Sequence, residues 1–198
     1  MNGVIPSAAP QQSTDERQVV ASLPYRRPIF LVGMMGAGTT TIGRGLARML
    51  GRDFLDLDHE IESRCGVRII HIFDIEGEEG FRRRECSVLE QCSSQADLVL
   101  ATGGGAVLAA ENRRVLKARG VVIYLRATPE ELYSRVARDR NRPLLQTADP
   151  QARIRDLLAQ REPLYEEVAD IVFDTGTMPV HHVVKALVPL LQNFEVKE

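Results

Sequence analysis

The chain has few lysines, few cysteines and no long apolar run. Its lysines stand only at positions 117, 185 and 197, and its net charge is −2 with a pI near 6.1. Proteins that bind nucleic acids usually carry a basic excess, so this balance argues against such a partner. No segment approaches the length of a membrane-spanning helix, and the N-terminus has no basic stretch followed by an apolar core. We therefore expect a cytoplasmic protein that binds neither nucleic acid nor membrane.

The three cysteines, Cys65, Cys86 and Cys92, are odd in number and lack the spacing of metal ligands. This favours free, inert thiols in a reducing compartment. Arginine carries nearly all of the positive charge and suits bidentate contact with phosphate or carboxylate. A genome rich in G and C produces the same bias, so composition alone leaves both explanations open.

The first 26 residues are rich in proline, serine, glutamine and alanine and show no periodicity. We interpret residues 1–26 as a disordered extension, either dispensable or used for regulation or docking, and residues 27–198 as one domain.

Within that domain, predicted strands alternate with predicted helices. Apolar runs indicate strands at residues 28–32, 98–101, 121–125 and 171–173, and residues 53–58 are predicted as a strand with acids at its C-terminal end. Helical periodicity and caps indicate helices at residues 39–50, 59–64, 69–75, 78–92, 111–118, 129–138, 150–168 and 180–194. Such alternation predicts an α/β fold: a parallel sheet of about five strands, helices on both faces, and a ligand at the carboxyl ends of the strands.

The segment Gly33–Thr41, G-M-M-G-A-G-T-T-T, joins the first strand to the first helix. Its spacing matches G-x-x-x-x-G-K-[ST], except that Thr39 stands in the lysine position. Glycines allow the backbone N–H groups and the helix N-terminus to face an anion. A purely structural turn is the alternative, but the context of strand and helix favours nucleotide phosphates.

Two acids close the second strand. One of Asp56 and Asp58 could hold Mg²⁺ through water, and the other could accept a proton from a substrate hydroxyl. The alternative is that they cap the next helix, as Asp58 could do for residues 59–64. Further along, Arg82 and Glu85 share a helix face and could pair; Arg82 either grips a carboxylate or belongs to a solvated charged face.

Three further features fall at the same edge of the sheet or near it. Gly103, Gly104 and Gly105 follow a buried strand, which suggests backbone lying against a ligand. Residues 138–145 combine arginines with a proline and could form a lid over phosphates or a solvated loop. Arg161 adds a cation before a helix interruption at Pro163. The four histidines have no partners that suggest metal or triad chemistry.

Together these motifs resemble those of the shikimate kinase family. The pieces G-x-M-G-A-G-x-T-T, F-x-D-x-D, I-F-x-x-E-G-E-x-x-F-R-x-x-E, T-G-G-G, R-x-R-P-L-L and R-x-x-L-Y occur in family order over residues 28–190. The resemblance implies a three-layer P-loop fold of the nucleoside monophosphate kinase type with a mobile lid. It also implies transfer of the γ-phosphoryl of ATP to the 3-hydroxyl of shikimate, with Mg²⁺, on the pathway to chorismate and aromatic amino acids.

The resemblance also implies roles for individual residues of a protein that we expect to be monomeric. Asp58 would hold shikimate hydroxyls and act as the base, while Arg142 would be the lid cation that contributes to catalysis and contacts the phosphates. Thr40 would ligate Mg²⁺, with Asp56 supporting it through water. The remaining shikimate-binding residues would be Arg82, Arg161, Gly103, Gly104 and Gly105. The remaining ATP-binding residues would be Gly36, Ala37, Gly38, Thr39, Thr41, Arg135 and Pro179.

The family has lysine where this chain has Thr39. Threonine is short and neutral, and the loss of one preorganised electrostatic contact typically lowers a rate by about 10²–10³-fold. We therefore expect an intact substrate pocket with severely reduced turnover. A ligand-binding module that has lost catalysis is the alternative. A related kinase acting on gluconate is a third interpretation, but the paired arginines and the triple glycine argue against it.

Overall fold

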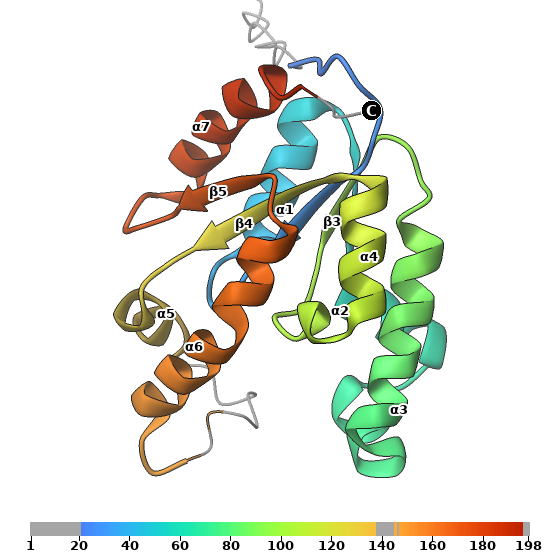
Figure 1. The fold of residues 1–198 in the computed structure, drawn as a ribbon, viewed down its shortest axis with the longest axis vertical. Coiled ribbons are helices and arrows are strands. Elements are labelled where there is room, and N and C mark those ends of the chain that lie inside the picture. Colours follow the sequence, from blue (N-terminus) through green and yellow to red (C-terminus); the bar gives the residue numbers. More distant parts are fainter. Residues whose placement is uncertain (1–20, 138–144, 146, 196–198) are drawn as a thin grey trace, which may run out of the picture.

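The computed structural model describes residues 21–137, 145 and 147–195, and these form a five-stranded parallel sheet between helices (Figure 1). The strand order is β2-β3-β1-β4-β5. The strands are β1 (Ile29–Val32), β2 (Asp53–Asp56), β3 (Leu98–Ala101), β4 (Val121–Arg126) and β5 (Ile171–Asp174). Every residue of β1 and β3 is buried, as expected for central strands of a parallel sheet covered on both faces.

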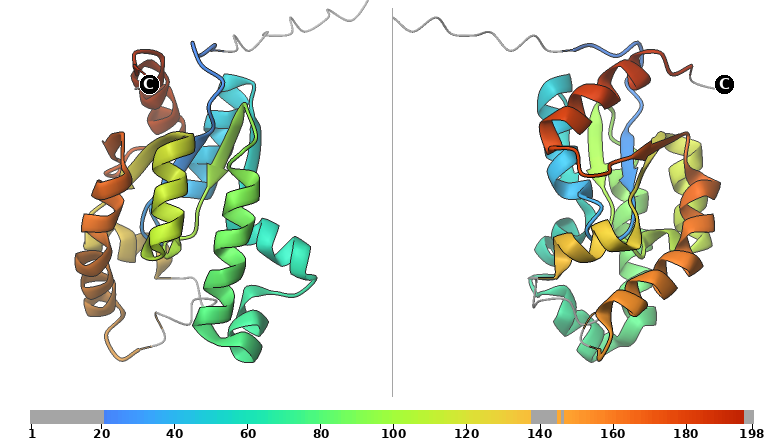
Figure 2. Two further views of the ribbon diagram at one scale, coloured as in Figure 1. Left: turned by 45° about the vertical axis from the view of Figure 1, so that its right-hand side comes forward. Right: turned by 90° about the vertical axis from the view of Figure 1, so that its left-hand side faces the viewer.

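Helices cover both faces of this sheet, so the predicted three-layer α/β architecture is confirmed (Figure 2). On one face, α1 packs against α7; on the other, α4 lies beside α3 and near α6. The helical elements are α1 (Thr39–Leu50), α2 (Leu57–Cys65), α3 (Ile69–Cys92), the 3₁₀ turn η1 (Ala106–Leu108), α4 (Ala110–Arg119), α5 (Pro129–Val136), α6 (Pro150–Val168) and α7 (Val180–Gln192). None of the helices in the described part of the chain is both long and apolar enough to cross a membrane.

Local chemistry explains where the helices begin and end. Gly38 precedes α1 with φ 92° and Gly51 follows it with φ 63°, left-handed values that favour glycine. Between them, the apolar stripe of Ile42, Leu46 and Leu50 is buried against the sheet. The Thr128 cap predicted for α5 is present as a capping box with Glu131.

The structure corrects one predicted boundary and agrees with another. The second strand ends at Asp56 rather than residue 58, because the Asp56 side chain accepts hydrogen bonds from the backbone N–H groups of Asp58 and His59 and starts α2. The two helices predicted at residues 69–75 and 78–92 are present on either side of Gly77, whose non-helical φ of 68° separates them by a kink; both lie within the element labelled α3.

The chain just before β1 packs against the domain. Ala21 donates a backbone hydrogen bond to Met49 at the end of α1, and the Tyr25 hydroxyl donates to the carbonyl of Leu191 in α7, 3.1 Å away. Residues 21–26, placed in the predicted extension, therefore contact the folded core. The rest of that predicted extension, residues 1–20, lies outside the described residues.

Candidate active site

The carboxyl edge of the sheet collects the segments singled out from the sequence. The glycine loop follows β1, Asp56 ends β2 with Asp58 just after it, and Gly103–Gly105 follow β3. Because β3 lies between β2 and β1 and pairs with both in parallel, the three segments emerge side by side. The N-terminal parts of α3 and α6 extend beyond this edge on either side of it (Figure 1).

The glycine loop wraps tightly before α1. Gly36 and Gly38 have φ values of 86° and 92°, and a Cβ on Gly33 would lie 2.8 Å from the carbonyl oxygen of Leu125. Gly38 has no side chain that could cap α1. The backbone N–H groups of Thr39 and Thr40, at the start of the helix, therefore have no side-chain acceptor at the N-cap position. This geometry suits a bound anion such as a phosphate group.

Thr39 is the first residue of α1 and is half-buried. The lysines within the described residues lie elsewhere, Lys117 on α4 and Lys185 on α7. The loop is therefore built for an anion but carries a neutral side chain at this position.

Thr40 and Asp56 meet directly. The Thr40 hydroxyl donates to Oδ2 of Asp56 over 2.6 Å, while Oδ1 of Asp56 caps α2. The structure thus corrects the alternative that Asp58 caps this helix. A hydroxyl and a carboxylate oxygen side by side next to the phosphate loop are the hard ligands that Mg²⁺ prefers. Among the described residues, no cluster of three or more histidine, cysteine, aspartate or glutamate side chains is placed to hold another metal ion.

Asp58 faces the glycine segment after β3 instead. A Cβ on Gly103 would lie 2.6 Å from Oδ1 of Asp58, so a larger residue at this position would displace the carboxylate. Burial, followed by the negative charges of Asp56 and Glu85, raises the pKa of Asp58 to about 7, while Arg82 opposes the shift. A carboxylate with this pKa can exchange a proton near neutral pH.

Arg82 turns inward from α3. Its guanidinium pairs with the buried carboxylate of Glu85 at 2.7 Å and lies against Gly105, where a Cβ would collide with it. The next residue, Arg83, shows the contrast, because 67% of its side chain is exposed and it pairs with the exposed Glu79. The interpretation of Arg82 as part of a solvated charged face therefore does not hold.

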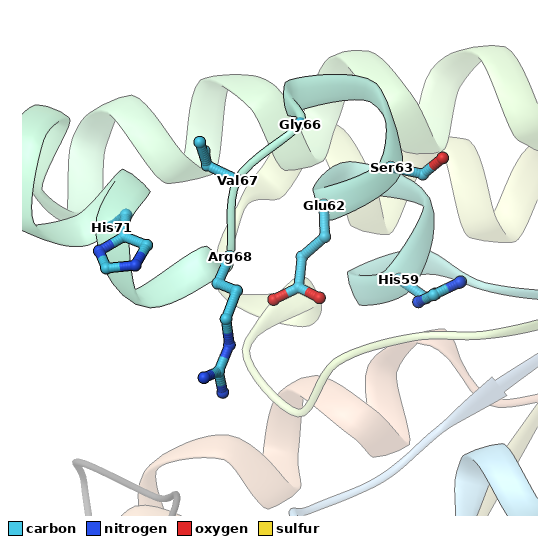
Figure 3. Close-up of a pocket in the computed structure, with 7 residues that line it drawn as sticks. All are labelled: His59, Glu62, Ser63, Gly66, Val67, Arg68 and His71. Atoms are coloured by element: carbon cyan, nitrogen blue, oxygen red, sulfur yellow. The ribbon is translucent and has the colours of Figure 1, made fainter.

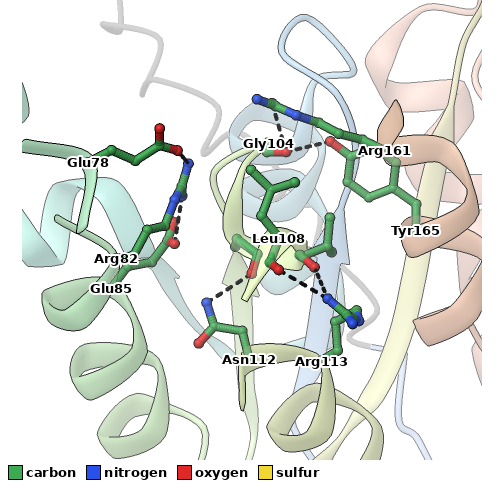
Figure 4. Close-up of polar contacts among 11 residues, drawn as sticks. Glu78, Arg82, Glu85, Gly104, Leu108, Asn112, Arg113, Arg161 and Tyr165 are labelled. Carbon is green, nitrogen blue, oxygen red and sulfur yellow. Dashed lines mark hydrogen bonds and ion pairs between the residues drawn. The ribbon is translucent and has the colours of Figure 1, made fainter. Parts of the chain in front are cut away.

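Arg161 reaches the same region from α6. It is 7% exposed, and its Nη1 donates to the carbonyl of Gly104 at 3.2 Å; the Tyr165 hydroxyl donates to that carbonyl at 2.6 Å (Figure 4). The helix interruption expected at Pro163 is absent, since α6 continues through this proline to Val168. As a result, Arg161 and Tyr165 stand one turn apart on the same buried face.

Arg135 connects the glycine loop to the segment that follows the edge strand β5. It donates to the carbonyls of Gly36 and Gly176 and to the hydroxyl of Thr175, which follows β5. Pro179 occupies the N-cap position of α7 just beyond. Arg142 and most of the predicted lid lie outside the described residues.

Two contributors to this site had no assigned role in the sequence. Glu85 was visible only as a possible partner of Arg82, and its almost complete burial could not be read from the three-residue spacing. Tyr165 stood in a motif without a function. A separate hollow of about 580 Å³ lies over α2 and the start of α3, outside the predicted site (Figure 3); its lining residues are His59, Glu62, Ser63, Gly66, Val67, Arg68 and His71.

A parallel sheet with a glycine-rich anion loop, an adjacent hydroxyl–carboxylate pair, and basic and acidic side chains at the same edge defines a phosphotransferase of the P-loop class. Comparison with known proteins identifies the family within this class. The family model for shikimate kinase matches residues 35–192. A shikimate kinase of Bordetella pertussis is 66% identical over 177 residues, which make up 89% of this chain and 84% of that relative. The chain belongs to the shikimate kinase family.

Solved structures agree with this assignment. Shikimate kinase from Acinetobacter baumannii in complex with shikimate matches with a TM-score of 0.81 at 50% identity, over 84% of this chain and 93% of the other. A gluconokinase from Sinorhizobium meliloti matches with a TM-score of 0.54 at 14% identity, over 84% and 92% of the two chains, and so shares the fold alone.

Proposed function

We propose that this chain transfers the γ-phosphoryl group of ATP to the 3-hydroxyl of shikimate, slowly because of Thr39. The observation that carries the proposal is the convergence of Asp58, Arg82 and Arg161 around Gly103–Gly105, beside the N-terminus of α1. A titratable carboxylate and two cations next to an anion loop support transfer from a nucleotide to a small hydroxy acid.

The two arginines fit the carboxylate of shikimate. Both guanidinium groups are held inward, Arg82 by Glu85 and Arg161 by the carbonyl of Gly104, so little side-chain entropy remains to be lost on binding. Each guanidinium group can donate two parallel hydrogen bonds to a carboxylate. The glycines Gly103, Gly104 and Gly105 would then lie along the ring, and a side chain at Gly103 or Gly105 would displace Asp58 or Arg82.

Asp58 is proposed as the base. Its carboxylate would accept the proton of the 3-hydroxyl as that oxygen bonds to the γ-phosphorus and the bond from phosphorus to the departing ADP oxygen breaks. With a pKa of about 7, Asp58 is ionised in about half of the molecules at neutral pH and is more basic than an ordinary carboxylate.

The other end of the site would hold the nucleotide. Residues 36–41 would bind the phosphates through backbone N–H groups, with Arg135 and Pro179 beside the adenine and Arg142 over the phosphates. Thr40 and Asp56 would hold Mg²⁺, which offsets phosphate charge when bound. The pairing of their oxygens over 2.6 Å supports this ligand set.

A catalytically silent module that binds shikimate is the second candidate, and the neutral Thr39 is the observation that favours it. The enzyme is preferred because the binding and base residues are retained together. We further propose that the protein acts as a cytoplasmic monomer.

An ADP-release assay with ATP, Mg²⁺ and shikimate, run beside a calorimetric titration with shikimate, tests these proposals. We expect binding with slow, shikimate-dependent ADP release. Binding without detectable turnover would favour the silent module, and absence of both would contradict the assignment of the site.

A further inference from the structure

The segment Gly103–Leu108 is held in place mainly from outside itself. Asn112 and Arg113 of α4 donate to the carbonyls of Ala106, Val107 and Leu108 and so fix its second half (Figure 4). Its first half, where the ligand would lie, is held at the carbonyl of Gly104 by Arg161 and Tyr165 of α6.

Of these two donors, Tyr165 is the better anchor. Its hydroxyl lies 2.6 Å from the Gly104 oxygen, against 3.2 Å for Arg161, and its side chain is fully buried. A tyrosine ring has few rotamers to lose, and this one is stacked on Tyr124 with centroids 4.9 Å apart. Arg161, in contrast, is the group proposed to turn its donors to the shikimate carboxylate.

Gly104 also touches the nucleotide end of the site. A Cβ on Gly104 would lie 3.2 Å from the backbone nitrogen of Met35 and 3.3 Å from the carbonyl oxygen of Gly33. The Tyr165 hydroxyl itself lies 3.8 Å from the sulfur of Met34. The same hydroxyl therefore sits at the contact between the glycine segment and the phosphate loop.

We infer that Tyr165 is a positioning residue: its hydroxyl holds the Gly104 carbonyl so that Gly103–Gly105 keep the shape that receives shikimate beside the phosphate loop. This inference rests on the proposed function for the identity of the ligand. Burial raises the pKa of Tyr165 to about 12, so the hydroxyl stays protonated and donates at neutral pH. With Tyr165 on the carbonyl, Arg161 is free to engage the substrate without releasing the loop.

Tyr124 supplies a matched control. It is stacked on Tyr165 and equally buried, but its hydroxyl has no hydrogen-bond partner among the described residues. Tyr165→Phe and Tyr124→Phe therefore each delete one buried oxygen from the same ring stack, and only the first removes a donor to Gly104.

The test measures shikimate and ADP dissociation constants by calorimetry on the full chain and both variants. For Tyr165→Phe we expect a roughly tenfold higher Kd for shikimate and less than a threefold change for ADP, because the phosphate loop keeps its own backbone bonds. Tyr124→Phe should leave both constants within twofold. A Tyr165→Phe protein that unfolds more readily but binds shikimate as before, or that loses both ligands equally, would overturn the inference.

Amide hydrogen exchange without ligand separates this inference from the proposed function. The N–H groups of Ala106 and Leu108 bond back to Gly103 and Gly105, 3.0 Å away in each case, and report opening of the segment. We expect them to exchange about tenfold faster in Tyr165→Phe, while the N–H of Val183 in α7 is unchanged. If the parent chain does not bind shikimate, the proposed function fails, and this exchange still decides whether Tyr165 holds the segment; unchanged exchange would refute it.

Discussion

At the residue scale, two side chains determine how the site can work. One is neutral at an anion-binding loop, and the other is a carboxylate with a raised pKa. Thr39 is neutral at the start of α1, where the loop geometry favours an anion. Asp58 is a carboxylate whose proton is held to about pH 7 by burial and by its acidic neighbours. Thr39 limits the stabilisation of the transferring phosphoryl group, and Asp58 sets the pH range of proton transfer.

Thr39→Lys is expected to raise turnover by about 10²–10³-fold, because it adds a preorganised cation where charge develops in the transition state. Lysine is also a better helix former than threonine, so α1 should tolerate it. The measurement is kcat from the ADP-release assay. Thr39→Ser, which stays neutral, is the control and should remain slow. Ordinary kinase turnover by the parent chain would show that this interpretation of the loop is wrong.

Asp58 should also make stability depend on pH. Its pKa is about 7 in the folded chain and near 3.8 when unfolded, so the native state binds more protons between these values. The contribution is favourable at low pH and is lost as the pH rises through 7. Asp58→Asn lacks this loss, so its free energy of unfolding relative to the parent should increase by about 1–2 kcal/mol between pH 5 and pH 8, after allowance for partial exposure. Urea unfolding at both pH values measures it; a constant difference would contradict the raised pKa.

At the element scale, one side chain at the start of α2 makes two kinds of hydrogen bond. Asp56 caps this helix with Oδ1 and receives the Thr40 hydroxyl with Oδ2. The stability of an element and a proposed metal ligand are therefore linked, and a substitution at Asp56 affects both.

Asp149 allows the two effects to be separated, because it caps α6 by accepting from the backbone N–H of Ala152 at 2.9 Å and lies outside the site. Asp56→Ala and Asp149→Ala should each lower the free energy of unfolding by about 1 kcal/mol, the usual value of an N-cap. Only Asp56→Ala should also weaken the Mg²⁺-dependent binding of ADP. The measurements are urea unfolding and calorimetry with and without Mg²⁺, and equal ADP binding by both variants would argue against Asp56 as a metal-supporting residue.

At the scale of the whole molecule, the site is assembled where α6, α3 and three strand ends meet, while the opposite edge is closed by the chain before β1. There, Tyr25 bonds to α7, and its ring lies 5.6 Å from the guanidinium of Arg52. Arg52 in turn donates to the carbonyls of Tyr25 and Arg27. The folded unit therefore includes residues that composition alone placed in the extension.

Two truncations test this boundary. Removal of residues 1–20 should change the free energy of unfolding by less than about 0.5 kcal/mol, whereas removal of residues 1–26 should lower it by about 2–3 kcal/mol because the buried part of Tyr25 and its hydrogen bond are lost. Thermal and urea unfolding of both proteins provide the comparison. Equal stability would mean that the contacts of residues 21–26 contribute nothing.

The fold was predictable to a large extent, because its signals are local. Buried apolar runs, the helix period of residues 39–50 and the Thr128 cap depend on neighbours within a few residues, and the structure confirms them. One boundary was wrong for an equally local reason, since Asp56 begins α2 early, whereas the break at Gly77 agrees with the two helices predicted around it.

The alternation of strands and helices, the phosphate loop and the family motifs could be predicted from the sequence, because each depends on residues that are close together in the chain. Only the tertiary structure decided which side chains meet: Thr40 with Asp56, Asp58 with Gly103, and Tyr165 with Gly104. Periodicity says which face of an element is buried but not what it is buried against. The partners in these pairs come from different elements, and their distances follow from strand order and helix packing.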